Sequence, residues 1–254
     1  MAPETAPMLP PVVRGPSTRA LLSLDWSYPV HAPPAVALAE GATTAKAVRK
    51  ALTYEEAFAE IAGEDPRPLL VLRECAVCNG TDDALLSRSV DNERTFLLAR
   101  WFHCVKLPVD VLSDDHPFRN LFPGGRSEHL FLATRDGTQR IALEGERSRA
   151  ELWSAMQSVL ASDYAADADH VLKAIQRKLD RLDAADQRLG ELQSRYDQLL
   201  ESEGANSAKL KKARAKLAEG RAERDALLDE VQAAGSELEL RHPTPHEPAN
   251  ADKP

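Results

Sequence analysis

Cysteine is scarce in this chain, and the scarcity limits how the protein is stabilised. Only three of the 254 residues are cysteines, at positions 75, 78 and 104. Small secreted domains that depend on disulfides contain many more. The count excludes a disulfide-stapled scaffold and favours a transient disulfide over a structural one.

Long apolar runs and an excess of positive charge are also missing. No stretch approaches the roughly 20 apolar residues that span a bilayer, and residues 1–7 lack the basic start and apolar core of a signal peptide. The formal net charge is −8, which argues against broad binding of nucleic acid or of an anionic membrane. We expect a cytoplasmic protein that binds neither nucleic acid nor membranes and needs no cofactor.

Composition divides the chain into five segments. Residues 1–18 are rich in proline and predict a disordered tail, and residues 19–50 form an N-terminal extension. Residues 51–163 alternate between helix and strand patterns, whereas residues 164–241 are charged and helical throughout. Residues 242–254 contain four prolines and predict a second disordered tail.

Residues 51–163 predict an α/β domain. A short helix from Thr53 precedes a buried strand at 69–72, and two helical pieces follow, at about 82–87 and 93–101. The next strand is expected at 104–111.

The second half of this domain has sharper local signals. Strands at 130–133 and 139–143 flank Asp136-Gly137, a strong hairpin signal, and Ser148 with Glu151 forms a capping box that opens the last helix. The order of elements predicts a mixed sheet with helices on both faces.

The sequence Cys75-Ala-Val-Cys78 lies directly after the first buried strand. Two thiols separated by two residues on the first turn of a helix are close enough to bridge. Unpaired N–H groups and the helix dipole stabilise a thiolate there, and the thiolate is the reactive form. This placement favours dithiol–disulfide chemistry.

Residues 53–161 resemble the thioredoxin-like family in the order of their elements. The resemblance is carried by the segments Tyr54–Phe58, Pro68–Leu72, Cys75–Cys78, Arg94–Phe102, Val105–Asp110 and Leu130–Gly137. It implies a thioredoxin-like mixed sheet with flanking helices. It also implies a thiol-disulfide oxidoreductase in which Cys75 attacks a protein disulfide and Cys78 resolves the mixed disulfide.

Two alternatives to redox chemistry remain open. Zinc would need two ligands besides the cysteine pair, and His103, Cys104, His116 and His129 are available. His103 and Cys104 are adjacent on a predicted strand and point to opposite faces, and Cys104 suits a small buried core residue. Alternatively, the domain is degenerate and the protein is a non-catalytic adaptor. Glu74 stands where family members commonly have tryptophan, and 126–129 where they usually have a cis-proline.

Residues 164–241 repeat apolar side chains at alternating steps of three and four, the pattern of a coiled coil. One position of the repeat contains Ile175, Leu182, Leu189, Tyr196, Leu210, Leu217, Val231 and Leu238. The pattern predicts self-association or a helical partner through residues 164–241. The basic cluster 209–216 is interpreted as a solvated helix face.

The repeat is interrupted at 203–206, and again at Gly220 and Arg224. A turn at 203–206 would make an antiparallel hairpin. Because the repeat resumes without a change of phase, we expect a continuous intermolecular coiled coil in preference to the hairpin.

Overall fold

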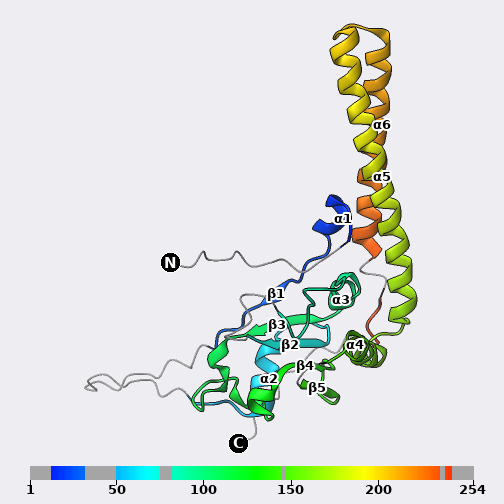
Figure 1. Ribbon diagram of the computed structural model, residues 1–254. Helices are drawn as coiled ribbons and strands as arrows, with labels where there is room; N and C mark the ends of the chain where they lie inside the picture. The colour runs from blue at the N-terminus through cyan, green and yellow to red at the C-terminus, as the bar shows by residue number, and fades with distance from the viewer. Residues whose placement is uncertain (1–12, 32–49, 75–81, 145–146, 235–237, 242–254) are drawn as a thin grey trace, which may run out of the picture.

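The residues that the structure describes form a five-stranded sheet with helices on both faces, and a long helical hairpin projects from this domain (Figure 1). The computed structural model describes residues 13–31, 50–74, 82–144, 147–234 and 238–241. Within these residues, none of the helices has the length and apolarity needed to cross a membrane.

The sheet is mixed, as the sequence predicted. Its strand order is β1-β3-β2-β4-β5. β1, β3 and β2 run parallel, whereas β4 is antiparallel to β2 and β5 is antiparallel to β4. The strands are β1 Trp26–Ser27, β2 Leu69–Arg73, β3 His103–Leu107, β4 Glu128–Ala133 and β5 Arg140–Glu144.

The central strand β2 is buried along its whole length because both of its faces are covered. Leu69 and Val71 belong to a core that includes side chains of α2, Tyr54–Ala62. Leu70 and Leu72 point the other way, into a core that includes side chains of α3, Glu93–Ala99, and α4, Arg149–Asp163. The period of two along one strand therefore separates the two cores.

Local signals place the two capped helices where the sequence predicted them. Thr53 Oγ1 accepts a hydrogen bond from the backbone N–H of Glu56 at 3.2 Å, and the Glu56 carboxylate accepts one from the backbone of Thr53 at 2.9 Å. Ser148 and Glu151 make the same reciprocal pair at the start of α4. Gly137 has a φ of +72° in the turn between β4 and β5, which suits glycine.

Two predicted elements in this domain are wrong. Residues 82–87 form turns rather than a helix, with the backbone N–H groups of Leu85 and Leu86 both donating to the carbonyl of Asp82. The strand expected at 104–111 ends at Leu107, because Pro108 has no N–H to continue the ladder, and residues 109–112 form a 3-10 helix.

The expected disordered tail 1–18 overlaps an ordered segment. Residues 13–18 lie within the described structure, and the short helix α1, Pro16–Ala20, begins at a proline. Ser17 is held there by helix α5, Ala168–Glu203, since its backbone N–H and its hydroxyl both donate to the carboxylate of Asp186, at 3.2 Å and 3.0 Å. Contacts with a distant helix, absent from any local pattern, order this segment.

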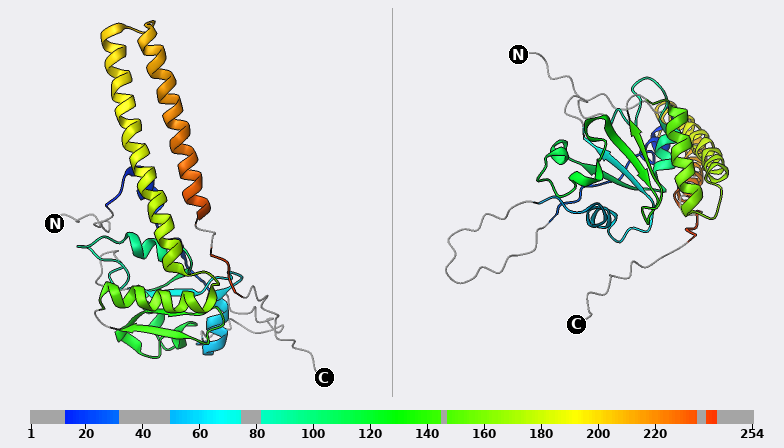
Figure 2. Two further views of the ribbon diagram at one scale, coloured as in Figure 1. Left: turned by 90° about the vertical axis from the view of Figure 1, so that its right-hand side faces the viewer. Right: turned by 90° about the horizontal axis from the view of Figure 1, so that it is seen from below.

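The continuous coiled coil is wrong, and the chain forms the antiparallel hairpin instead. Helix α5 covers Ala168–Glu203 and helix α6 covers Ala208–Ala234. Between them Gly204 adopts a φ of +78°, which ends α5. Folding back lets α6 cover the apolar stripe of α5 within one chain. Figure 2 shows the two helices projecting from one side of the sheet domain.

The base of the hairpin shares a core with the domain. Ile175, Leu179 and Leu182 of α5 belong to the same buried cluster as Leu70 and Leu72 of β2. The segment after α6 returns to the domain, where the backbone N–H of Arg241 donates to the carbonyl of Asp163 at 2.8 Å. The hairpin is therefore attached at both of its ends.

Gly220 does not interrupt the helical seam, contrary to the prediction. It is buried, and a Cβ atom added there would lie 3.0 Å from Leu192 Cδ1 and 3.6 Å from Leu189 Cδ1. The missing side chain lets two leucines of α5 pack directly on the backbone of α6. Gly190, on the exposed side of α5, has nothing within 4 Å of the same added atom.

We predict opposite effects for Gly220→Leu and Gly190→Leu. Leucine is a good helix former, so Gly190→Leu should stabilise the protein by about 0.5–1 kcal/mol. Gly220→Leu should destabilise it by about 1–3 kcal/mol because Leu189 and Leu192 must be displaced. Urea unfolding followed by far-UV circular dichroism measures both. Equal effects of the two substitutions would refute close packing at Gly220.

Candidate functional site

The predicted redox pair, Cys75 and Cys78, lies outside the described residues, and the structure describes both flanks of that segment. Before it, the backbone N–H of Glu74 donates to the carbonyl of Leu107 at 2.8 Å. After it, the Asp82 carboxylate pairs with Lys106 Nζ at 2.8 Å. Neighbouring residues of β3 therefore hold the two ends of segment 75–81.

Lys106 is held by a second contact besides Asp82. Its Nζ lies 4.7 Å from the centre of the ring of Trp26. Trp26 belongs to β1, which pairs with β3 on the side away from β2. A cation over an aromatic face is attracted by the ring quadrupole. Trp26, Lys106 and Asp82 thus connect β1, β3 and the far flank of the cysteine segment.

Arg73, the last residue of β2, is a buried cation two residues before Cys75. It is only 6% exposed, and it continues the face of Leu69 and Val71. Its Nε donates to the carbonyl of Glu128 at 3.2 Å and its Nη2 to the carbonyl of Arg126 at 3.0 Å. A buried guanidinium is costly unless it is hydrogen-bonded, and these carbonyls supply the acceptors. Arg73 therefore ties the end of β2 to residues 126–128, where the chain enters β4.

His129, the second residue of β4, lies beside the guanidinium of Arg73. The Nη2 atom of Arg73 lies 3.2 Å from His129 Nδ1. Burial, and secondly the charge of Arg73, lower the pKa of His129 below its ordinary value. The imidazole is therefore neutral at pH 7 and can accept a hydrogen bond from the guanidinium.

The side chain of Glu128, the first residue of β4, holds the same stretch of the chain through further contacts. Its side chain is 1% exposed and pairs with Arg140 of β5, while its Oε2 accepts from the backbone N–H of Gly124 at 3.2 Å. The Arg140 guanidinium also lies 4.2 Å from the centre of the Phe131 ring. Residues 126–129, at the position where thioredoxin-like proteins usually have a cis-proline, lead into β4 and are thus held by two arginines. No cis peptide bond occurs among the described residues.

Cys104 is a core residue. Its Sγ donates to the carbonyl of Ala99 at 3.5 Å, and burial raises the pKa of its thiol to about 12. At pH 7 it is therefore protonated and unreactive. His103, its neighbour, turns to the opposite side and bonds Asp65 at 3.0 Å.

The described residues do not assemble a metal site. Within the parts of the chain that the structure covers, histidine, cysteine, aspartate and glutamate side chains form no group of three or more that could hold a metal ion. His116, another of the zinc candidates, accepts a hydrogen bond from the backbone N–H of Phe118 at 3.2 Å.

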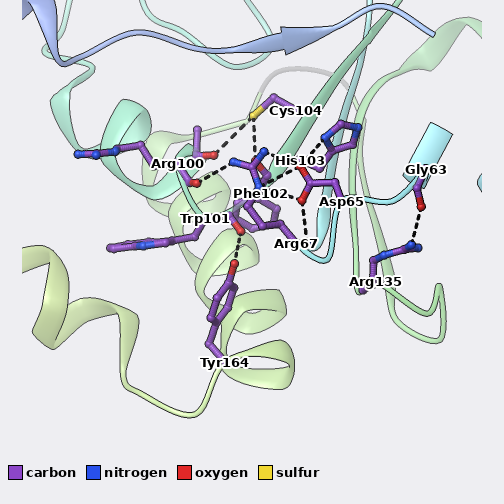
Figure 3. Close-up of polar contacts among 11 residues, drawn as sticks. Gly63, Asp65, Arg67, Arg100, Trp101, Phe102, His103, Cys104, Arg135 and Tyr164 are labelled. Atoms are coloured by element: carbon purple, nitrogen blue, oxygen red, sulfur yellow. Dashed lines mark hydrogen bonds and ion pairs between the residues drawn. The ribbon is translucent and has the colours of Figure 1, made fainter. Parts of the chain in front are cut away.

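A second polar cluster lies at the start of β2 and β3, at the strand ends opposite to the cysteine segment. Figure 3 shows Asp65 between Arg67 and His103, and Arg67 reaching the carbonyl of Arg100, to which its Nη1 donates at 3.1 Å. Tyr164 donates to the carbonyl of Trp101 at 2.8 Å. Every one of these bonds joins parts of the fold to one another, so we assign the cluster a structural role.

Electrostatics in this cluster favour ionised Asp65. Burial alone would raise the pKa of the Asp65 carboxyl, but hydrogen bonds from the side chain and backbone of Arg67, with the charges of Arg67 and His103, lower it to about 2. Asp65 is therefore ionised at neutral pH, where it keeps its ion pair with Arg67.

Sequence patterns suggested that Arg73 offsets the charge of Glu74, but they did not predict the contacts of Arg73, Glu128 and Arg140. One available signal is an arginine that directly ends an all-apolar strand, because its alternation with Val71 puts it on a buried face. The partners of such a residue depend on which loop crosses it, and that is a property of the tertiary fold.

Comparison of the chain with protein-family models, with curated proteins and with solved structures gives no match. The fold places it in the broad class of mixed α/β proteins with a five-stranded mixed sheet.

Replacing Asp65 with Asn should make stability less dependent on pH. The folded-state pKa is depressed from 3.8 to about 2, so Asp65 contributes stability above pH 3.8 and loses it as the pH falls through 2. At pH 7 we expect Asp65→Asn to cost about 1–3 kcal/mol, with the difference vanishing below pH 2. Urea unfolding at several pH values measures this. The control Asp115→Asn, on an exposed turn, should have little effect; a pH-independent loss in Asp65→Asn would contradict the account.

Replacing Arg73 with Met should raise the pKa of His129. In the wild type, NMR titration should give His129 a pKa below 6.5, because burial and the Arg73 charge both disfavour the imidazolium. Arg73→Met removes the second cause only, so the pKa rises but stays below 6.5. Arg126→Met, which changes an exposed arginine of the same loop, should leave it unchanged. An unaltered His129 pKa in Arg73→Met would contradict this geometry.

Proposed function

We propose that this protein is a thioredoxin-like thiol-disulfide oxidoreductase that acts on protein disulfides through Cys75 and Cys78. The observation that carries the proposal is the place of the pair in the sequence relative to the described strands. It follows the buried central strand β2, and both flanks of its segment are attached to β3.

The order of the described elements supports the thioredoxin-like assignment. Helix α2, strand β2, the cysteine segment, helix α3, strand β3, the hairpin of β4 and β5, and helix α4 follow one another as the resemblance implies. The sheet has helices on both faces, with α2 on one and α3 and α4 on the other. The 3-10 segments between β3 and β4 complete the face of α2.

The proposed reaction is a two-step exchange. The Cys75 thiolate attacks one sulfur of a substrate disulfide, which breaks the substrate S–S bond and releases one substrate thiolate. The Cys78 thiolate then attacks Cys75 and releases the second substrate thiolate. Two electrons pass to the substrate, and the protein is left with a Cys75–Cys78 disulfide. A dithiol reductant then reduces this disulfide, which regenerates the two thiols and oxidises the reductant.

Arg73 supplies the electrostatic support for a thiolate. Successive Cα atoms are about 3.8 Å apart, so the Cα atoms of Arg73 and Cys75 are within about 7.6 Å of each other. A cation near a thiol lowers its pKa. The carboxylate of Glu74, between them in sequence, acts in the opposite sense. The buried position of Arg73 favours its charge in this balance because solvent screens an exposed carboxylate more strongly.

A second candidate function is a non-catalytic adaptor whose helical hairpin carries the activity. The continuity of the hairpin base with the domain core favours it, because such an arm is held in a fixed direction. The two candidates differ in what they tolerate. An adaptor would retain its function in a Cys75→Ser, Cys78→Ser double variant, whereas an oxidoreductase would lose it.

The test is the reduction potential of the cysteine pair. The full-length protein carrying Cys104→Ser is equilibrated in dithiothreitol or glutathione buffers, and its free thiols are counted by mass spectrometry. We expect a reversible two-electron couple with a potential of roughly −120 to −270 mV. A protein whose two thiols never titrate together would refute the oxidoreductase and favour the adaptor. The Cys75→Ser variant is the control that should show no couple.

A further inference from the structure

The outer end of the hairpin separates positive and negative charge between its two helices. The first three turns of α6 contain five basic residues and no acid: Lys209, Lys211, Lys212, Arg214 and Lys216. The last turns of α5 have an acidic excess, formed by Asp197, Glu201 and Glu203 against a single Arg195. The term "hairpin tip" denotes residues 187–220 below.

Both groups of charges oppose the dipole of their own helix. A helix favours acids at its N-terminus and bases at its C-terminus. The first turn of α6 has no acid, and the last turn of α5 has no base. A charge placed against the dipole in a terminal turn is unfavourable, and salt screens the effect, so the arrangement gains from compensation elsewhere.

Ion pairs within the hairpin compensate few of these charges. Nearer the domain, ion pairs cross between the helices, from Arg181 to Glu230 at 3.2 Å and from Arg188 to Glu223 at 3.0 Å. At the tip, Lys209 and Glu203 pair at 2.5 Å. Among the described residues, the other four bases of the cluster have no acid within ion-pairing distance, and Asp197 and Glu201 have no base within it. Asp197 accepts a hydrogen bond from Gln193 Nε2 at 2.9 Å.

The α5 side of the apolar seam at the tip is also incompletely covered, whereas Leu210 and Leu217 on the α6 side are buried. Near the domain the α5 residues Ile175, Leu179 and Leu182 are fully buried. Beyond Ala185, the seam residues of α5 are only half-buried: Leu189, Leu192, Tyr196 and Leu199. A groove of about 990 Å³ runs along these turns of α5, from Gln187 to Ser202. Leu192 and Leu199 line it together with polar side chains and with Arg188, Glu191 and Arg195.

We propose that the hairpin tip binds the hairpin tip of a second copy of this chain, with α6 of each copy against α5 of the other. A two-fold axis uses the same surface twice. It therefore brings the basic helix of each copy against the acidic helix of its partner, so both charge mismatches are relieved together. The half-buried seam would be covered in the same contact.

Charge complementarity favours a second copy over an anionic polymer. A nucleic acid would meet the carboxylates of α5 beside the lysines of α6, and the basic cluster contains no aromatic side chain for stacking. The proposal is independent of the redox chemistry, because it uses no residue of the cysteine segment.

The experiment uses charge reversal in the full-length protein, with sedimentation equilibrium as the readout. One variant carries Lys211→Glu, Lys212→Glu and Lys216→Glu, and the other carries Asp197→Lys and Glu201→Lys. We expect the wild type to dimerise at about 50 mM salt and to bind about tenfold more weakly at about 500 mM. Each variant alone should be monomeric because like charges then face each other, and an equimolar mixture of the two should dimerise.

Controls separate a loss of association from a loss of folding. Circular dichroism should show the wild-type helix content in both variants. Asp114→Lys with Asp115→Lys changes net charge as the α5 variant does, on an exposed part of the domain, and should dimerise like the wild type. A wild type that stays monomeric at about 100 μM, where weak complexes with micromolar Kd would form, would overturn the proposal. So would reversed variants that dimerise alone, or a mixture that does not.

Discussion

One apolar core supports both parts of this molecule. It joins one face of the sheet, α3 and α4 to the base of the hairpin, from Leu70 and Leu72 on β2 to Leu182 on α5 and Val231 on α6. Full burial of one large aliphatic side chain stabilises a fold by about 1.5–3 kcal/mol, so a few such contacts are enough to hold the hairpin. The direction of the projecting helices therefore follows from the packing of the domain.

Polar contacts reinforce this junction without replacing the core. Arg14 binds Glu93 of α3 at 2.5 Å, and it also binds Asp180 at 2.5 Å and Asp183 at 3.0 Å on α5. It thereby joins the N-terminal segment, the domain and the hairpin at one point. On the opposite face of β2, Arg73 joins the end of the central strand to residues 126–128, where the chain enters β4. The proposed redox segment thus starts from a strand that is fixed on both faces.

The sequence predicted those features whose causes are local. The capping residues Thr53 and Ser148 and the Asp136-Gly137 turn act within a few residues, and each appears where it was expected. The hairpin was misjudged because a heptad repeat is the same whether its partner is another chain or a later part of the same chain; Gly204 decides between them through its backbone conformation. Gly220 was misinterpreted, and the bonds of Arg73 were not predicted, because their partners lie far away in sequence.

Native-state hydrogen exchange tests most directly whether the domain and the hairpin base fold as one unit. If they share a core, amides of β2 and β3 and those of α5 between Val171 and Ala185 should exchange with the same, highest free energy of opening. Amides of the hairpin tip should exchange through smaller openings, because the α5 side of their seam is only half-buried. If instead the whole of α5 and α6 opens together while the sheet remains protected, the shared core does not hold the hairpin, and the central claim fails.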